Sequence, residues 1–259
     1  MESELSFPVN YYIKQEDKRY CVNDWLNKEI EIIYHHKINC LYCSKPTNKS
    51  FFQGFCYPCF ISLPQADASV INPELCRAHE GISRDMEWAK ENCLIDHHVY
   101  LSLTSGLKVG VTRETQIPTR WIDQGAEFAI KLAKTPYRQL AGLIEVELKP
   151  YVSDKTSWQR MLKGKFTNDV DLVEEKEKLI EYLPEELQYY INDDDEIIEI
   201  NFPVLSYPEK VKSINLDKID SYKGILTGIK GQYLMFNDGQ VFNIRKHGGY
   251  KVTININGI

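Results

Sequence analysis

Two Cys-X-X-Cys pairs constrain the fold of this sequence more than any other feature. They are Cys40-Leu-Tyr-Cys43 and Cys56-Tyr-Pro-Cys59, with twelve residues between them. A two-residue gap lets both thiolates of a pair face one ion, and two pairs complete the tetrahedron that zinc prefers with soft ligands. A redox-active Cys-X-X-Cys motif, in contrast, usually occurs singly beside a βαβ unit. The sequence therefore predicts a structural zinc site, which would supply folding free energy to a segment too short for a core of its own.

A second group of potential metal ligands follows the first. Its members are Cys76, His79, Cys93 and one of the adjacent pair His97 and His98. Together they would make a Cys₂His₂ set, with His97 as the fourth ligand. Their spacing is less regular than that of the first group, and a single Cys or His is often a buried core residue. Two interpretations therefore stay open, a second metal site or a set of core side chains.

The chain has 259 residues, which is enough for two or three small domains. Its apolar runs are far shorter than the roughly 20 residues of a membrane-spanning helix. Its N-terminus has early acidic residues and lacks the basic start and apolar stretch of a signal peptide. We therefore expect a cytoplasmic protein without a membrane segment, whose cysteines are reduced or metal-bound.

The net charge of −6 is set by one segment of the chain. Residues 166–200 hold 2 Lys/Arg and 13 Asp/Glu, whereas residues 1–165 and 201–259 have net charges of +1 and +4. The neutral to basic remainder permits local contacts with phosphate. The acidic segment is interpreted as a solvated helix and loop between domains, or as a docking element for a protein partner.

Hydrophobic patterning predicts an α+β fold with strands at both ends of the chain. We divide the chain into an N-terminal β segment, a zinc-binding Cys/His-rich module with a zinc ribbon, a small mixed sheet with helices, an acidic helical connector and a small antiparallel β domain. These parts correspond to residues 1–39, 40–98, 99–165, 166–200 and 201–259.

Three local signals predict where elements begin or turn. Thr135, followed by Pro136, can cap the helix after the strand FAIKLAK. Asp171, with Glu174 three residues later, is typical of a second helix start. Asp238-Gly239 lies between two strand-like runs and predicts a hairpin turn.

The stretch HVYLSLTSGLKVGVTRETQIPTRW, residues 98–121, carries a resemblance to a known fold. It resembles the core of the GIY-YIG nuclease superfamily, in which two short motifs on a hairpin precede a helix that bears an Arg. Tyr100 stands in the first motif, Lys108 and Gly110 stand in the second, and Arg120 opens the helix. In LAGLIEVELK, Glu145 matches the metal-binding Glu of the downstream helix.

The resemblance implies a metal-dependent phosphodiesterase. Tyr100 would lie near the attacking water, Glu145 would hold a single Mg²⁺ or Mn²⁺ ion, and Arg120 would offset charge on the phosphate. The neighbouring residues that could bind phosphate are Lys108, Thr112 and Arg113. Helical spacing by itself, with Leu140, Leu143 and Ile144 on one face, favours Glu147 rather than Glu145 as the inward-facing acid.

The chain departs from the superfamily pattern at three positions, and the first is His98, which replaces the Gly of the first motif. Lys108 stands where the second motif has Tyr, and Gln124 stands where nucleases often have His. Over residues 9–250 the chain also resembles an uncharacterised bacterial family, domain of unknown function 2797. The matching stretches include KSFFQGFCYPCF, PELCRAHEG and KVGVTRETQIPTRWIDQGA. That family name implies no activity.

Three hypotheses about function follow from these observations. The first is a zinc-containing protein associated with DNA or RNA, whose GIY-YIG-like core is not catalytic. The second is a metal-dependent nuclease that uses Tyr100, Arg120 and Glu145. The third is a protein–protein adaptor that docks through the acidic segment at 166–200.

Overall fold

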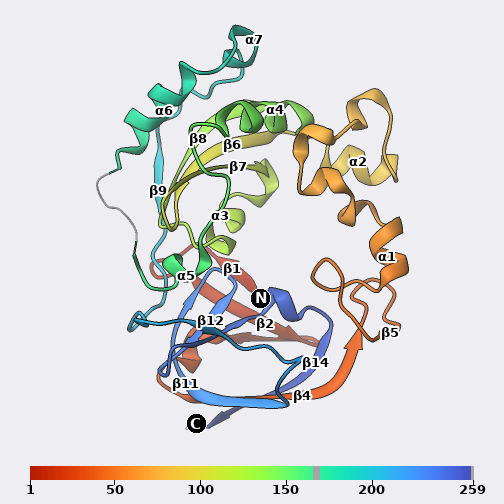
Figure 1. Ribbon diagram of the computed structural model, residues 1–259, viewed down its shortest axis with the longest axis vertical. Helices are drawn as coiled ribbons and strands as arrows, with labels where there is room; N and C mark the ends of the chain where they lie inside the picture. The colour runs from red at the N-terminus through yellow and green to blue at the C-terminus, as the bar shows by residue number, and fades with distance from the viewer. Residues whose placement is uncertain (166–169, 258–259) are drawn as a thin grey trace. The chain divides into compact units, whose positions relative to one another are not determined.

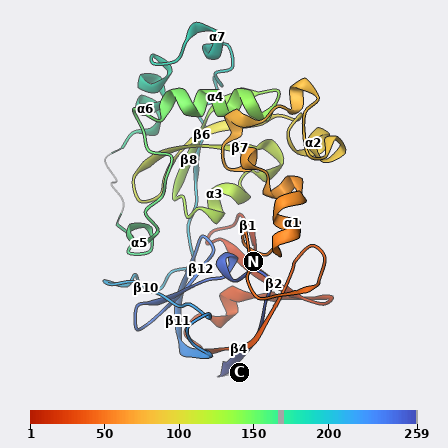
Figure 2. The same ribbon diagram turned by 45° about the vertical axis from the view of Figure 1, so that its right-hand side comes forward.

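The computed structural model describes residues 1–165 and 170–257 (Figures 1 and 2). The chain divides into two compact units, each described by itself. We call the first the β unit; it comprises Met1–Ile61, Leu162–Gly164 and Ile200–Ile259. We call the second the α/β unit; it comprises Ser62–Met161 and Lys165–Glu199. The α+β class predicted from the sequence is confirmed.

The β unit contains two sheets. The smaller is antiparallel, in the order β1-β2-β3. The larger has the order β10-β13-β12-β11-β4-β14, and β5 also pairs with β4. The strands are β1 (Glu2–Glu4), β2 (Asn10–Gln15), β3 (Lys18–Cys21), β4 (Glu29–Asn39), β5 (Pro46–Thr47), β10 (Lys212–Ser213), β11 (Ser221–Lys230), β12 (Tyr233–Phe236), β13 (Gln240–Asn243) and β14 (Tyr250–Asn257).

Strand β4 joins the two ends of the chain in one sheet. It pairs antiparallel with both β11 and β14, and Ile32 has Tyr222 and Ile254 as its partners on the two sides. Ile30 and Ile32 are fully buried, while Glu29 and Glu31 are half-buried. Buried and half-buried residues therefore alternate in this strand. Residues 1–39 and 201–259 contribute strands to a common sheet and do not form separate parts. The pairing spans about two hundred residues of sequence, so no local pattern indicates it.

The α/β unit is built around a four-stranded antiparallel sheet in the order β7-β6-β8-β9. Helix α4 packs on β6, β7 and β8, and α6 on β6 and β8, so that one core forms between helices and sheet (Figure 1). The strands are β6 (His97–Leu103), β7 (Leu107–Arg113), β8 (Phe128–Thr135) and β9 (Ile197–Glu199). The helices are α2 (Met86–Asn92), α3 (Thr119–Asp123), α4 (Arg138–Leu148), α5 (Trp158–Met161), α6 (Leu172–Ile180) and α7 (Glu185–Gln188).

Helix α1 (Tyr57–Ser62) begins directly after Cys56 and contains Cys59, so it holds part of the second cysteine pair. Short 3₁₀ turns complete the structure: η1 (Val22–Trp25), η2 (Pro64–Ala66), η3 (Ala68–Val70), η4 (Pro73–Leu75), η5 (Ala78–Glu80), η6 (Glu114–Gln116) and η7 (Arg245–His247). Among the described residues, no helix has both the length and the apolar character needed to cross a membrane.

The described part of the acidic segment packs on the α/β unit and is not a solvated connector. Leu172 and Leu179 of α6, with Leu183 and Leu187 beyond it, are buried in the core that also contains the sheet. Asp171 caps α6 as predicted, because its carboxylate accepts hydrogen bonds from the N–H groups two and three residues ahead. The apolar side chains of this segment thus belong to the core of the unit, and its acidic side chains lie on the outer surface.

The helix predicted to begin at Thr135 and Pro136 begins later. Thr135 is the last residue of β8 and still pairs with His97 of β6, so sheet register rather than local capping decides its conformation. Helix α4 starts at Arg138, after an N-cap residue, Tyr137, that makes no side-chain capping bond. The hairpin turn predicted at Asp238-Gly239 is confirmed: it joins the antiparallel strands β12 and β13, and Gly239 has a φ of +79°.

The close contact between α4 and η4 predicts a large effect of one methyl group. A Cβ added at Gly142 would lie 2.2 Å from the backbone nitrogen of Glu74 and 2.5 Å from the carbonyl carbon of Pro73. Gly142→Ala should therefore lower the free energy of unfolding by about 1 to 3 kcal/mol, although Ala favours an isolated helix over Gly by up to ~1 kcal/mol. Chemical denaturation measures the change.

Gly106→Ala is the matched control, because a Cβ there meets no atom within 4 Å. A Gly142→Ala protein as stable as the Gly106→Ala protein would contradict this packing.

Candidate functional site

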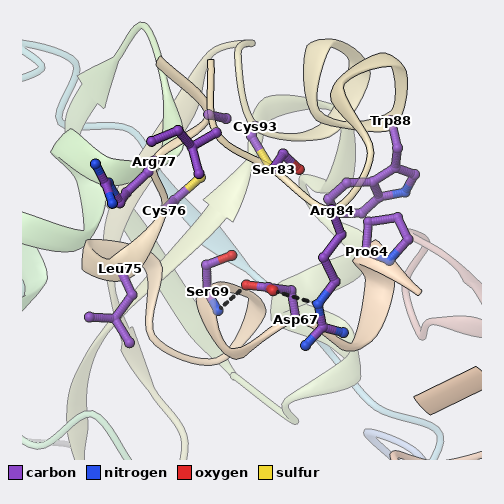
Figure 3. Close-up of a pocket in the computed structure, with 12 residues that line it drawn as sticks. Pro64, Asp67, Ser69, Leu75, Cys76, Arg77, Ser83, Arg84, Trp88 and Cys93 are labelled. Atoms are coloured by element: carbon purple, nitrogen blue, oxygen red, sulfur yellow. Dashed lines mark hydrogen bonds and ion pairs between the residues drawn. The ribbon is translucent and has the colours of Figure 1, made fainter. Parts of the chain in front are cut away.

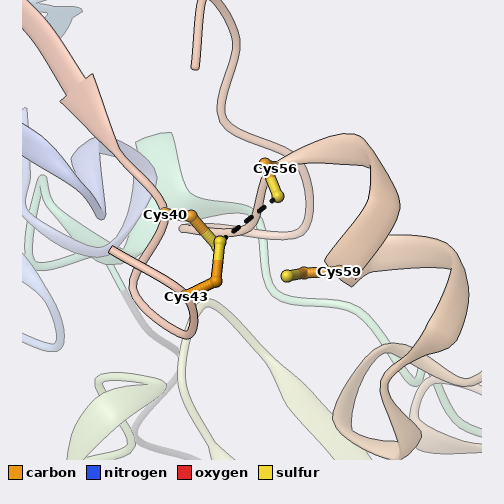
Figure 4. Close-up of side chains that lie close together, drawn as sticks. All are labelled: Cys40, Cys43, Cys56 and Cys59. Atoms are coloured by element: carbon orange, nitrogen blue, oxygen red, sulfur yellow. Dashed lines mark hydrogen bonds between the residues drawn. The ribbon is translucent and has the colours of Figure 1, made fainter. Parts of the chain in front are cut away.

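The four cysteines of the two Cys-X-X-Cys pairs converge on one point, which we call the tetracysteine site. Their sulfur atoms all lie within 4.8 Å of one another, and the Cys43 and Cys56 sulfurs are 3.8 Å apart (Figure 4). Cys40 follows β4 and Cys59 lies in α1. A turn closed by the Ser44 N–H on the Cys40 carbonyl, at 2.9 Å, folds the first pair back on itself.

This arrangement fits a zinc ion. A tetrahedron with Zn–S bonds of about 2.3 Å has sulfur–sulfur edges of about 3.8 Å, which is the distance between the Cys43 and Cys56 sulfurs. Burial would raise the pKa of the Cys40 thiol, but N–H groups of Cys43, Cys56 and Tyr42 point at its sulfur and lower that pKa instead. The backbone is therefore arranged to stabilise the thiolate form that binds metal. Four protein ligands leave no open position, as in structural sites.

The second group of potential ligands is gathered only in part. Cys76 and Cys93 are buried together in one small cluster. His79 stacks on Tyr137 at 4.8 Å, and His97 bonds the carbonyl of Ile95 through Nδ1 at 2.7 Å. Among the described residues, 1–165 and 170–257, the tetracysteine site is the one place where three or more His, Cys, Asp or Glu side chains bring their donor atoms together. A second metal at Cys76, His79, Cys93 and His97 stays a prediction.

The α/β unit places five polar side chains together, which we call the Tyr100 cluster. Tyr100 on β6 and Lys108 on β7 both donate hydrogen bonds to Oε1 of Gln124, at 2.6 and 2.8 Å. Arg120 of α3 and Glu145 of α4 lie close enough for their charges to act on both donors. Gln124 follows α3 directly, so that two strands and two helices contribute to one site.

Most of the cluster is removed from solvent. Tyr100 is fully buried, Lys108 is 4% exposed and Glu145 is 7% exposed. The close approach of β6 and β7 depends on Gly110, where a Cβ would lie 2.6 Å from the Tyr100 hydroxyl oxygen. Sheet pairing makes this contact necessary, since Tyr100 and Gly110 are direct partners and share one face.

Burial dominates the electrostatics of the Tyr100 cluster. It lowers the pKa of Lys108 to about 8, and the positive charge of Arg120 acts in the same direction. Burial raises the pKa of Tyr100, so its hydroxyl stays protonated at neutral pH. Burial also raises the pKa of Glu145, with partial compensation by Lys149, whose Nζ lies 3.4 Å from Oε2. Nε of Arg120 is buried and has no hydrogen-bond partner in the described part of the chain.

Glu145 of α4 is the acid that the resemblance indicates, and Glu147 is the acid that helical spacing favours. Glu145 rather than Glu147 is buried, because Ala141, Ile144 and Leu148 form the inner face of α4 and Leu143 is exposed. Counting Ala as an apolar residue would have identified that face.

Arg113 lies away from the Tyr100 cluster. It donates a hydrogen bond to Oδ1 of Asn92, and its charge acts on Cys93. Thr112, the residue of β7 that precedes Arg113, is buried, and its hydroxyl donates to the carbonyl oxygen of Arg113 at 3.4 Å. Arg113 is therefore separated from Lys108, because the two lie on opposite faces of β7, whereas Thr112 shares the face of Lys108.

Asp154 is a residue that sequence reasoning missed. Its carboxylate lies 3.6 Å from Nζ of Lys149, and its charge acts on Lys108 and Glu145. Nothing in the sequence marks it, because it lies in an irregular segment whose path is set by pairing with β7, through a bridge between Lys108 and Ser153.

The sequence model of one protein family matches residues 27–252. The chain belongs to this family, described as protein of unknown function (DUF2797). The matched residues include the tetracysteine site and the whole Tyr100 cluster. No curated protein and no solved structure matches the chain.

Removal of one tetracysteine ligand should release zinc. We expect Cys43→Ser to carry one zinc ion fewer per chain than the unaltered protein, measured by elemental analysis of the purified protein. A structural zinc site contributes folding free energy directly, so the melting temperature should fall by about 10 °C if roughly 3 kcal/mol is lost.

Cys21→Ser is the matched control, because Cys21 lies outside the tetracysteine site. Equal metal content in the two variants would contradict zinc binding by these four cysteines.

Proposed function

We propose that the protein binds nucleic acid, with a backbone phosphate held at the Tyr100 cluster and a structural zinc ion held at the tetracysteine site. The observation that carries the proposal is the pairing of two cations, Lys108 and Arg120, beside the Tyr100 hydroxyl. Lys108 is buried and Arg120 is half-buried, and Glu145 offsets their charges only in part, so an anion from outside would stabilise the pair. A phosphate group supplies that anion.

The donor groups of the Tyr100 cluster match the chemistry of phosphate. Arg120 presents a planar fork that suits two phosphoryl oxygens, and its Nε has no partner among the described residues. Lys108 adds an ammonium and Tyr100 a hydroxyl, both now directed at one amide oxygen of Gln124. A bound phosphate would offer these donors a charged acceptor in place of a neutral one.

The GIY-YIG resemblance supports a phosphodiester as the bound group. Hairpin β6–β7, helix α3, strand β8 and helix α4 follow one another in the order that the resemblance implies. They carry Tyr100, Lys108, Arg120 and Glu145 into one cluster. Binding is favoured over hydrolysis because the Tyr100 hydroxyl is buried, has a raised pKa and donates its proton to Gln124. Lys108 also replaces the second Tyr of the motif.

A metal-dependent phosphodiesterase is the second candidate. It is favoured by the position of Glu145, which is buried beside the cluster with Asp154 near the same lysine, Lys149. Carboxylate oxygens are the ligands that Mg²⁺ and Mn²⁺ prefer. In this alternative Glu145 would hold the ion, Arg120 would stabilise charge on the phosphoryl group and Tyr100 would orient the attacking water.

Equilibrium binding to fluorescently labelled nucleic acid tests the proposal. Single-stranded and duplex DNA and RNA are titrated with protein in EDTA, and anisotropy is recorded at several salt concentrations. Lys108→Gln and Arg120→Gln should each weaken binding about tenfold or more, because each removes a charge-assisted hydrogen bond. The slope of log affinity against log salt should also decrease by about one for each variant.

Lys90→Gln is the matched control, since Lys90 is an exposed lysine of the same unit that pairs with Glu87. Equal affinities of the Lys90→Gln, Lys108→Gln and Arg120→Gln proteins, all folded by circular dichroism, would exclude the Tyr100 cluster as the binding site. The same probes in Mg²⁺ or Mn²⁺, analysed on denaturing gels, report hydrolysis. Cleavage that Glu145→Ala abolishes would establish the second candidate.

The lowered pKa of Lys108 predicts a pH dependence of binding. An ordinary lysine stays charged until about pH 10, whereas Lys108 has a pKa of about 8. As pH rises from 7 to 9, Lys108 loses its proton and its attraction for phosphate, so affinity should fall by about five- to tenfold. Anisotropy titrations at fixed ionic strength measure this change.

Lys108→Arg separates this residue from other titrating groups, because arginine stays protonated throughout the window. The affinity of that variant should change little between pH 7 and pH 9. A decrease as steep as that of the unaltered protein would assign the pH dependence to another group.

A further inference from the structure

A cavity of about 250 Å³ in the α/β unit holds two cysteine side chains that the proposed function does not use (Figure 3). Cys76 follows η4 and Cys93 follows α2, and both line the cavity. Both side chains belong to one small buried cluster, and the close-up draws both of them at the upper side of the cavity. The cavity is several times larger than the roughly 30 Å³ that one water molecule occupies.

The backbone holds both cysteines firmly. The Cys76 N–H donates to the Pro73 carbonyl at 3.0 Å, and the Cys93 N–H donates to the Ala89 carbonyl at 2.7 Å. Ala78 and Ala89 are buried against them in a small apolar cluster. The backbone therefore holds both cysteines at the wall of one cavity.

The surroundings of the two thiols are electropositive. Arg138 donates to the carbonyl of Asn92 at 2.9 Å, and its charge acts on both Cys76 and Cys93. Arg113 adds a second positive charge near Cys93. The acid that lines the same cavity, Asp67, is paired with Arg84 at 2.9 Å. Nearby cations favour the reactive thiolate.

We propose that Cys76 and Cys93 are a redox-active dithiol, which a small peroxide entering the cavity oxidises to a disulfide. Hydrogen peroxide is the simplest such oxidant. The Cys76 thiolate attacks one peroxide oxygen, the O–O bond breaks, and hydroxide leaves from a sulfenic acid at Cys76. The Cys93 thiol then attacks that sulfur and loses its proton. A disulfide forms and the sulfenic oxygen leaves as water, so two thiols are oxidised and one peroxide is reduced.

This dithiol differs chemically from the other cysteines of the chain. The tetracysteine site has the geometry of a closed metal site, in which each thiolate is bound and shielded. Cys21 belongs to neither group. The proposal is independent of nucleic-acid binding, because the cavity and the Tyr100 cluster consist of different residues.

Peptide mapping of the full-length, zinc-loaded protein tests the proposal directly. The reduced protein is treated with a few equivalents of hydrogen peroxide, its free thiols are blocked with N-ethylmaleimide, and trypsin digestion is followed by mass spectrometry. Trypsin cleaves after Arg77, Arg84 and Lys90, so Cys76 and Cys93 lie on separate peptides. We expect these peptides to be linked in most chains after peroxide, and to separate on treatment with dithiothreitol.

Two outcomes would overturn the proposal. The first is complete alkylation of Cys76 and Cys93 after peroxide, with no linked peptide. The second is the loss of one metal ion per chain in both Cys76→Ser and Cys93→Ser, measured by elemental analysis, which would assign the pair to a second metal site. The same variants support the proposal if their metal content is unchanged and the remaining cysteine is oxidised beyond the sulfenic state.

Discussion

The antiparallel pairing of β4 with β11 and β14 is the interaction on which the β unit depends. It joins strands from both ends of the chain and buries Ile30 and Ile32 between them. It also positions the metal site, since β4 ends at Asn39 and Cys40 follows at once. The Asn39 N–H donates to the Gly249 carbonyl at 2.8 Å, so the first ligand is tied to the residue that precedes β14.

Strand β6 has the corresponding role in the α/β unit. All seven of its residues are buried, and it pairs with β7 on one side and β8 on the other. This pairing sets Tyr100 opposite Gly110, and the absence of a side chain at Gly110 leaves space for the tyrosine hydroxyl. The same register places Ser102 opposite Lys108, and the Lys108 side chain is buried there. The Tyr100 cluster is thus a consequence of strand register as much as of the residues themselves.

Signals that act within a few residues could be predicted from the sequence, whereas those set by distant pairing could not. The spacing of Cys40, Cys43, Cys56 and Cys59 specifies a tetrahedral set by itself, and Asp171 needs only the next turn of chain to act as a cap. Thr135 fails as a cap because β6 holds it in a sheet. The contribution of Asp154 could not be predicted, because its carboxylate reaches Lys149 only in the folded chain.

Both sites of the α/β unit hold two cations, one buried and one half-buried: Lys108 with Arg120, and Arg138 with Arg113. In the Tyr100 cluster, burial and Arg120 lower the pKa of Lys108, while Glu145 opposes them. Beside the dithiol, burial and Arg138 lower the pKa of Arg113, and the charge of Cys93 opposes them. Lys108 and Arg113 lie on one strand, five residues apart, and therefore on opposite faces of it. Strand β7 thus separates two positive environments, one beside Cys93 and one at the Tyr100 cluster, where we propose that a phosphate binds.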